Sequence, residues 1–146
     1  MFGGLGCYSL DNPPGLLNGY MEVLYALTRA GFATVRIEKT GMGDSRGKPC
    51  AEQDFDYEVQ GLVTGMQYAV TLPCIDRDNL IIFGHSMGGL TGPVAANEFP
   101  VKGIIAMATS AIGWFEYMMT NNRRQLVLGG VPYDSIEIKQ AEAERA

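Results

Sequence analysis

The fold is decided by one stretch of the sequence, Leu80-Ile81-Ile82-Phe83-Gly84-His85-Ser86-Met87-Gly88-Gly89. Its first four residues are apolar and bounded by turn residues, which is typical of a buried strand. The glycines that follow turn the chain, and residues 90–97 have a helical pattern in spite of Gly92-Pro93. We therefore predict a strand, a sharp turn that carries Ser86, and a helix.

Helices and strands are also expected to alternate around this stretch. Apolar residues recur at helical spacing in residues 20–27 and 55–70. The segments 32–37 and 101–107 are short, apolar and rich in β-branched residues, so both are predicted to be strands. Asn-Pro-Pro-Gly at residues 12–15 predicts a turn. Continuously apolar strands between helices indicate an α/β fold, a mostly parallel sheet with helices on both faces.

Composition excludes several classes of protein. The chain has 146 residues, 47% hydrophobic and 18% charged, which fits one folded domain and not a disordered chain. The net charge of −5 and the lack of a basic stripe argue against nucleic-acid binding. No apolar run is long enough for a membrane span, and no signal-peptide pattern opens the chain, so a cytoplasmic location is expected.

The cysteines and the histidine give little support to a metal site. Cys7, Cys50 and Cys74 lack the close spacing of zinc ligands, and His85 is the one histidine of the sequence. We expect no metal and no organic cofactor.

The chemistry is expected at Gly84-His85-Ser86-Met87-Gly88, a Gly-x-Ser-x-Gly pattern between a strand and a helix. In that context the serine sits on a tight, strained turn that exposes its hydroxyl at the edge of the sheet. The Met87 N–H, at the start of the helix, would point toward an oxyanion. The alternative is a glycine-rich turn with an ordinary serine.

This pattern resembles the nucleophile elbow of the α/β-hydrolases, in particular esterase or serine-peptidase-like members. The resemblance implies that Ser86 is the nucleophile of a serine hydrolase acting on carboxylic esters, small amides or peptides. The segment Gly3-Gly4-Leu5-Gly6-Cys7-Tyr8-Ser9 resembles the oxyanion loop of the family, so the Leu5 N–H would be the second oxyanion donor. His85 would contact substrate or pack beneath the elbow.

The same resemblance implies a partial fold. Residues 1–2 would remain of a third strand lying between residues 32–37 and 80–83, and residues 1–110 would form a partial core. Residues 111–146 would begin a helical cap, in which Trp114 and Phe115 line an apolar substrate pocket or pack within the cap.

The departures from the family pattern concern the other two catalytic groups. Family members place an acid and a histidine after later strands, and this chain ends before both positions. His85 adjoins Ser86 on a turn where neighbouring side chains diverge, so it is not expected to be the general base. Thr109-Ser110 stands where some members carry the acid. We expect a central fragment of a hydrolase with low or no activity alone; the alternative is a non-catalytic or residually active interaction module. A homo-oligomer or a complementing polypeptide is the expected partner.

Three smaller features leave alternatives open. By the resemblance, Cys7 and Cys50 follow neighbouring strands, so they form either a disulfide or two free thiols. Asp134 and Glu137 resemble a helix-capping pair. Arg123-Arg124 is a solvated pair or holds an anionic group of the substrate.

Overall fold

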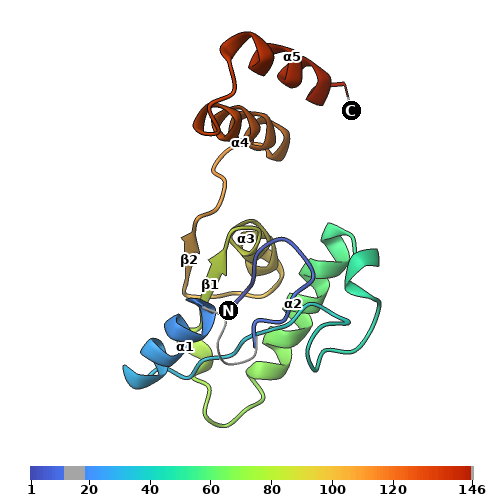
Figure 1. Ribbon diagram of the computed structural model, residues 1–146. Coiled ribbons are helices and arrows are strands. Elements are labelled where there is room, and N and C mark those ends of the chain that lie inside the picture. Colours follow the sequence, from blue (N-terminus) through green and yellow to red (C-terminus); the bar gives the residue numbers. More distant parts are fainter. Residues whose placement is uncertain (12–18, 146) are drawn as a thin grey trace. The chain divides into compact units, whose positions relative to one another are not determined.

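The structure is a computed structural model that describes residues 1–11 and 19–145. The turn predicted at residues 12–15 lies outside this part of the chain. The contacts divide the chain into two units, Met1–Thr109 and Ser110–Ala146, which we describe separately (Figure 1). Within the described residues, no helix has both the length and the apolar character needed to cross a membrane.

The first unit is built on two parallel strands, β1 (Ile81–His85) and β2 (Gly103–Met107). Their register places the first residues of the two strands opposite each other, and likewise the last. A parallel pair needs a long crossover, and α3 (Gly88–Glu98) lies within it. The predicted order of strand, turn, helix and strand is therefore confirmed.

The other two helices of this unit are α1 (Gly19–Arg29) and α2 (Phe55–Ala69), as their apolar spacing predicts. The carboxylate of Asp54 caps α2 by accepting a hydrogen bond from the Tyr57 N–H at 2.8 Å. Gly31 follows α1 with φ of 91°, a left-handed conformation that favours glycine. Two short 3₁₀ turns, η1 (Cys50–Glu52) and η2 (Arg77–Asn79), precede α2 and β1.

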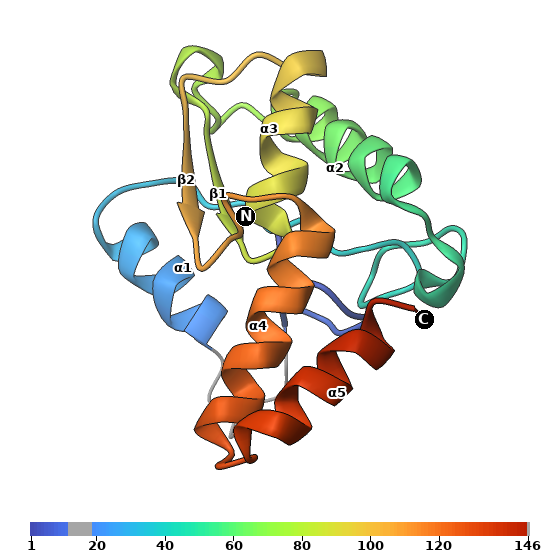
Figure 2. The same cartoon turned by 90° about the horizontal axis from the view of Figure 1, so that it is seen from above.

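The hydrophobic core lies on one face of the sheet, beneath α2 and α3 (Figure 2). Its buried members are Phe2, Val59, Leu62, Val63, Met66, Ile82 and Ala95. The absence of a side chain at Gly92 lets α3 approach the strand closely, because a Cβ there would lie 3.1 Å from Ile82 Cγ2. Strand alternation then turns Ile81 and Phe83 to the other face.

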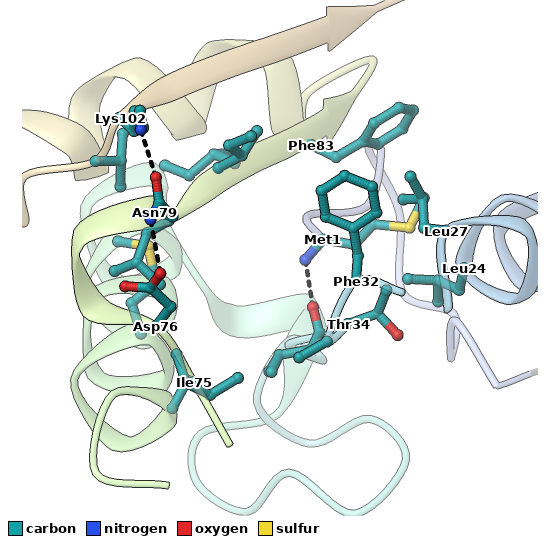
Figure 3. Close-up of a pocket in the computed structure, with 18 of the residues that line it drawn as sticks. Met1, Leu24, Leu27, Phe32, Thr34, Ile75, Asp76, Asn79, Phe83 and Lys102 are labelled. Carbon is teal, nitrogen blue, oxygen red and sulfur yellow. Dashed lines mark hydrogen bonds between the residues drawn. The ribbon is translucent and has the colours of Figure 1, made fainter. Parts of the chain in front are cut away.

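That other face borders an open cavity of about 650 Å³. Leu24 and Leu27 of α1 line it together with Phe32 and Phe83, as Figure 3 shows. The amine of Met1 also reaches this region, where it donates a hydrogen bond to the Val35 carbonyl. Helices therefore lie on both faces of the sheet, in agreement with the predicted α/β class.

The third strand is reduced to a single bridge. Phe2 pairs in parallel with Gly84: its N–H donates to Phe83 O at 2.9 Å, and its carbonyl accepts from the His85 N–H at 3.1 Å. The Ile37 N–H donates to Met1 O at 3.3 Å on the other side. This confirms the expected order, with residues 1–2 between residues 32–37 and β1.

The prediction of a strand at residues 32–37 is wrong. The segment is irregular throughout, although its apolar composition suits a strand. A strand exists only as a ladder of paired backbone groups, and its neighbour here contributes one residue, Met1, through bonds to Val35 and Ile37. The apolar composition of residues 32–37 is therefore not sufficient for a strand, because the neighbouring segment is too short to form a ladder with it.

The second unit is a pair of helices, α4 (Trp114–Leu128) and α5 (Tyr133–Ala143). Ile136 is buried in this unit, and the Gln140 amide donates to Met119 O at 3.0 Å. The predicted capping pair is wrong: Pro132 occupies the cap position of α5 and no side chain caps the helix. Asp134 lies inside the first turn.

Glu137 instead pairs with Arg123 across the two helices, with 2.7 Å between Oε1 and Nη1. The guanidinium also lies over the ring of Tyr133, 5.3 Å from its centroid. This pairing raises the pKa of Arg123 and lowers the pKa of Glu137. Arg123 is therefore paired at the surface of its own unit, and Arg124 is exposed, as the solvated alternative expects. That the pair holds an anionic group of the substrate remains a prediction.

Candidate active site

The backbone of Ser86 has the strained turn that a nucleophile elbow requires. Its φ is 53°, in the left-handed region, which costs a residue other than glycine about 1 kcal/mol or more. The turn is held because the Ser86 N–H donates to Met107 O and the Ser86 carbonyl accepts from the Gly89 N–H. The strain is therefore offset by bonds to β2 and to the start of α3.

The two glycines of the motif are required by close backbone contact. A Cβ at Gly84 would lie 2.2 Å from the carbonyl oxygen of Gly88, and a Cβ at Gly88 would lie 2.5 Å from Phe2 O. Real Cβ atoms do not approach oxygen so closely. The spacing Gly-x-Ser-x-Gly thus follows from how tightly the turn folds between β1, residue 2 and α3.

The predicted oxyanion donors lie in the two segments that meet at this turn. Met87 immediately precedes α3, so its N–H belongs to the helix N-terminus. Leu5 is exposed, in a bend directly after the buried Gly4. Gly4 contacts the elbow: a Cβ placed on it would lie 3.3 Å from Ser86 Cβ and 3.4 Å from His85 Nδ1. That both N–H groups converge on one oxyanion remains a prediction.

Two tyrosines that the sequence analysis did not assign complete the surroundings of the elbow. The Gly4 N–H donates to the Tyr8 hydroxyl at 2.8 Å, and the hydroxyls of Tyr8 and Tyr20 are hydrogen bonded at 2.9 Å. The Tyr20 hydroxyl lies 2.6 Å from His85 Nδ1. Burial, aided by the hydrogen bond with Tyr8, raises the pKa of Tyr20 to about 12. Tyr20 is thus a neutral phenol near pH 7, and it cannot act there as a base.

The loop of residues 3–10 is fastened at two further points. Cys7 and Cys50 form a disulfide, so this alternative is confirmed over two free thiols. The Glu38 carboxylate accepts hydrogen bonds from Ser9 Oγ at 2.9 Å and from the Leu10 N–H at 2.8 Å. The loop is therefore held on both sides of Tyr8.

Comparison with known proteins agrees with this geometry. Residues 17–129 match a family model described as "Serine aminopeptidase, S33", which covers more than half of the chain. The chain belongs to this family of α/β-hydrolases. It is also 30% identical over 97 residues to an uncharacterized protein of Caenorhabditis elegans, an alignment that covers 62% of this chain and 19% of the relative. The chain thus spans about a fifth of that relative's length. No solved structure was found to match.

In this S33 family chain, the position after β2 does not supply a catalytic acid. Thr109 stands there, packed against the start of α3, where a Cβ at Gly89 would lie 2.6 Å from Thr109 Cβ. Its Oγ1 is buried and has no hydrogen-bond partner among the described residues. Ala108, just before it, has φ of 51°, so each of the two described strands is followed directly by a residue in the left-handed region, Ser86 after β1 and Ala108 after β2.

The remaining predicted site residues divide between the two units. In this hydrolase-family chain, His85, Ser86 and Met87 lie on the turn of the first unit, and Leu5 follows Gly4, which lies against that turn. Trp114 and Phe115 belong to the second, where both are exposed and the Trp114 ring lies 5.6 Å from that of Tyr117. Their role in substrate binding remains a prediction. Among the described residues, no group of three or more His, Cys, Asp or Glu side chains could hold a metal ion.

The missed residues left only a weak signal in the sequence. Tyr8 lies inside the loop that resembles the oxyanion loop, but no spacing rule links residues 8, 20 and 85. Aromatic residues at the start of an amphipathic helix, such as Tyr20, are usually core or surface packing. Their association needs the folded first unit.

Proposed function

We propose that this chain carries the nucleophile of a serine hydrolase that acts on carboxylic esters or small amides through Ser86. The observation that supports it most is the left-handed backbone of Ser86, between two glycines that have no room for a side chain. A serine that has only a structural role gains nothing from this strain.

In the proposed reaction, Ser86 Oγ attacks the acyl carbon and forms a C–O bond. The Met87 and Leu5 N–H groups stabilise the negative oxygen that develops. The bond to the leaving group then breaks, and the alcohol or amine departs with the proton that Ser86 gave up. Water attacks the acyl-serine, which releases the acid and restores the hydroxyl.

A general base must carry that proton, and His85 is poorly placed for it. Its Nδ1 is hydrogen bonded to Tyr20, and it is the one histidine of the sequence. We infer that the base and its acid partner come from polypeptide outside these 146 residues. Loss of the base costs about a million-fold in turnover, while oxyanion stabilisation and binding retain about a thousand-fold over water. We therefore expect the chain alone to have weak activity on activated esters and none on amides.

The outer edge of β2 supports a partner of this kind. Ile104, Ile105 and Met107 are exposed along this strand, which pairs only with β1 among the described strands. Such edges favour pairing with another chain. We expect a dimer or a complex with a complementing polypeptide. A monomer in sedimentation velocity at micromolar concentration would contradict the self-association.

The test of the proposed nucleophile is intact mass after reaction with a fluorophosphonate. The Ser86 oxygen would form a bond to phosphorus, fluoride would leave with the bonding electrons, and the hydroxyl proton would pass to the solvent. We expect one adduct that Ser86→Ala abolishes and Ser135→Ala, a change at a half-buried serine of α5, retains. No adduct, or one that survives Ser86→Ala, would favour the alternative of a non-catalytic interaction module.

A further inference from the structure

A continuous chain of hydrogen bonds joins the loop of residues 3–10 to the elbow. It runs from the Gly4 N–H to the Tyr8 hydroxyl, to the Tyr20 hydroxyl and to His85 Nδ1, with distances of 2.8, 2.9 and 2.6 Å. The tyrosine rings are nearly parallel, 19° apart, and the ring of His85 meets that of Tyr20 edge-on. Three separate segments of the first unit therefore converge on one polar path.

One arrangement of the protons satisfies every hydrogen bond of this path. The Gly4 N–H can only donate, so the Tyr8 oxygen accepts its hydrogen. Tyr8 can then donate to Tyr20, and Tyr20 can donate to His85 Nδ1, which places the imidazole proton on Nε2. This direction uses the hydroxyl protons of both tyrosines; in the reverse direction, the Tyr8 proton has no acceptor among its described partners.

The path connects the neighbours of the reacting groups. Gly4 precedes Leu5, which carries one proposed oxyanion donor, and His85 precedes Ser86. The disulfide at Cys7 and the bonds to Glu38 fasten the loop to other loops, whereas the tyrosine pair ties it to the elbow itself. Catalysis of acyl transfer depends on donors that are held in place before the charge develops.

We propose that Tyr8 and Tyr20 are positioning residues that act through His85 to hold Gly4 and Leu5 against the turn of Ser86. This inference rests on the proposed function, because it concerns how fast the Ser86 hydroxyl reacts. The tyrosines touch neither the reacting serine oxygen nor the acyl group in this role. The hydroxyl groups of the two tyrosines carry this positioning role, and their rings contribute to packing.

The first test measures the rate of phosphonylation of Ser86 at several fluorophosphonate concentrations, for Tyr8→Phe, Tyr20→Phe and the double variant. We expect the limiting rate to fall about tenfold, less than the hundredfold or more typical of a direct donor, with an unchanged half-saturation concentration. The double variant should be no slower than either single one, since the two hydroxyls act in one path. Tyr25→Phe, an exposed tyrosine of α1, is the matched control and should react like the wild type.

The second test observes His85 directly by ¹⁵N NMR. The sequence has one histidine, so its imidazole signals can be assigned without ambiguity. We expect ¹⁵N spectra to show His85 protonated on Nε2, and both tyrosine variants, but not Tyr25→Phe, to move the Nδ1 signal. Unchanged limiting rates in Tyr8→Phe and Tyr20→Phe, or a His85 signal insensitive to them, would overturn the proposal while a labelled Ser86 upholds the proposed function. A wild-type chain without any Ser86-dependent label would overturn both.

Discussion

Residues 81–85 and residues 32–37 lie on the two sides of Met1 and Phe2, and their backbones are held very differently. The first segment, β1, pairs with all five residues of β2 and turns into an elbow without room for one extra carbon. The second has bonds to the backbone of Met1, no regular structure, and an open cavity of about 650 Å³ beside it.

The difference teaches that apolar composition does not make a strand; a partner of matching length does. Both segments combine exposed side chains, such as Phe32 and Ile81, with partly or fully buried ones, but only β1 has a ladder that fixes its backbone. The elbow region can therefore store the strain of Ser86. We expect changes at the elbow to have larger effects than changes beside residues 32–37.

The largest effect is expected from Gly84→Ala. The added Cβ would lie 2.2 Å from the Gly88 oxygen, so the turn must move, at a cost of about 5 kcal/mol that rivals the stability of a small domain. Gly103→Ala, at the start of β2, adds the same atom where nothing lies within 4 Å and should be nearly neutral. Urea unfolding and phosphonylation of Ser86 measure both. Equal stability of the two variants would show that the elbow is not tightly packed.

An effect of pH on stability, of comparable size, is expected from the amine of Met1. Burial lowers the pKa of the Met1 amine from 8.0 to about 5, so the folded chain holds a neutral amine where the unfolded chain is protonated. The unfolded state therefore binds more protons between pH 5 and 8, and stability rises with pH across this window, by at most about 4 kcal/mol.

Urea unfolding of the 146-residue chain at pH 5.5, 6.5 and 7.5 measures this slope. His85→Asn is the control, because it removes the one histidine of the sequence, and it should leave the slope in place. A free energy of unfolding that stays flat over these pH values would mean that the amine is solvated and that the region of residues 32–37 is still looser.

The Cys7–Cys50 disulfide joins the loop of residues 3–10 to the chain that follows residues 32–37. Its two cysteines are 43 residues apart, so its removal should lower stability by about 4 kcal/mol through the entropy of the unfolded chain. We expect this loss in Cys7→Ser/Cys50→Ser and almost none in Cys74→Ser, whose thiol is free and exposed. Alkylation of the unfolded chain should modify one cysteine without reductant and three with it; three in both cases would show that the bridge is absent.

The sequence was sufficient to predict the part of the fold that rests on local pattern. The strand at residues 80–83, the turn at Ser86 and the amphipathic helices each follow from periodicity and glycine placement within a few residues. The strand expected at residues 32–37 could not be judged in this way, because its formation depends on a partner elsewhere in the chain. The capping pair expected at Asp134 and Glu137 could not be judged in this way either, because Glu137 pairs with Arg123 across two helices.

In the candidate site, too, the residues of a local motif could be predicted from the sequence and those brought together by packing could not. Ser86 and Met87 were assigned from a contiguous motif, and their backbone agrees with it. The path through Tyr8, Tyr20 and His85 joins residues that lie far apart in the sequence, through hydroxyl contacts that no local pattern encodes. Groups brought together by tertiary packing require the structure.

The smallest effects on stability are expected at two glycines of α2, Gly61 and Gly65. A Cβ at Gly61 meets only Thr40 Cγ2 at 3.9 Å, so Gly61→Ala should raise stability by about 1 kcal/mol through helix propensity. A Cβ at Gly65 would lie 2.7 to 2.9 Å from three carbons of Ile37, so Gly65→Ala should lower stability by about 1 kcal/mol. Urea unfolding of both variants measures how firmly residues 32–37 are held against α2. If Gly65→Ala is as stabilising as Gly61→Ala, Ile37 gives way at no cost, and this segment rests on its few bonds to Met1 alone.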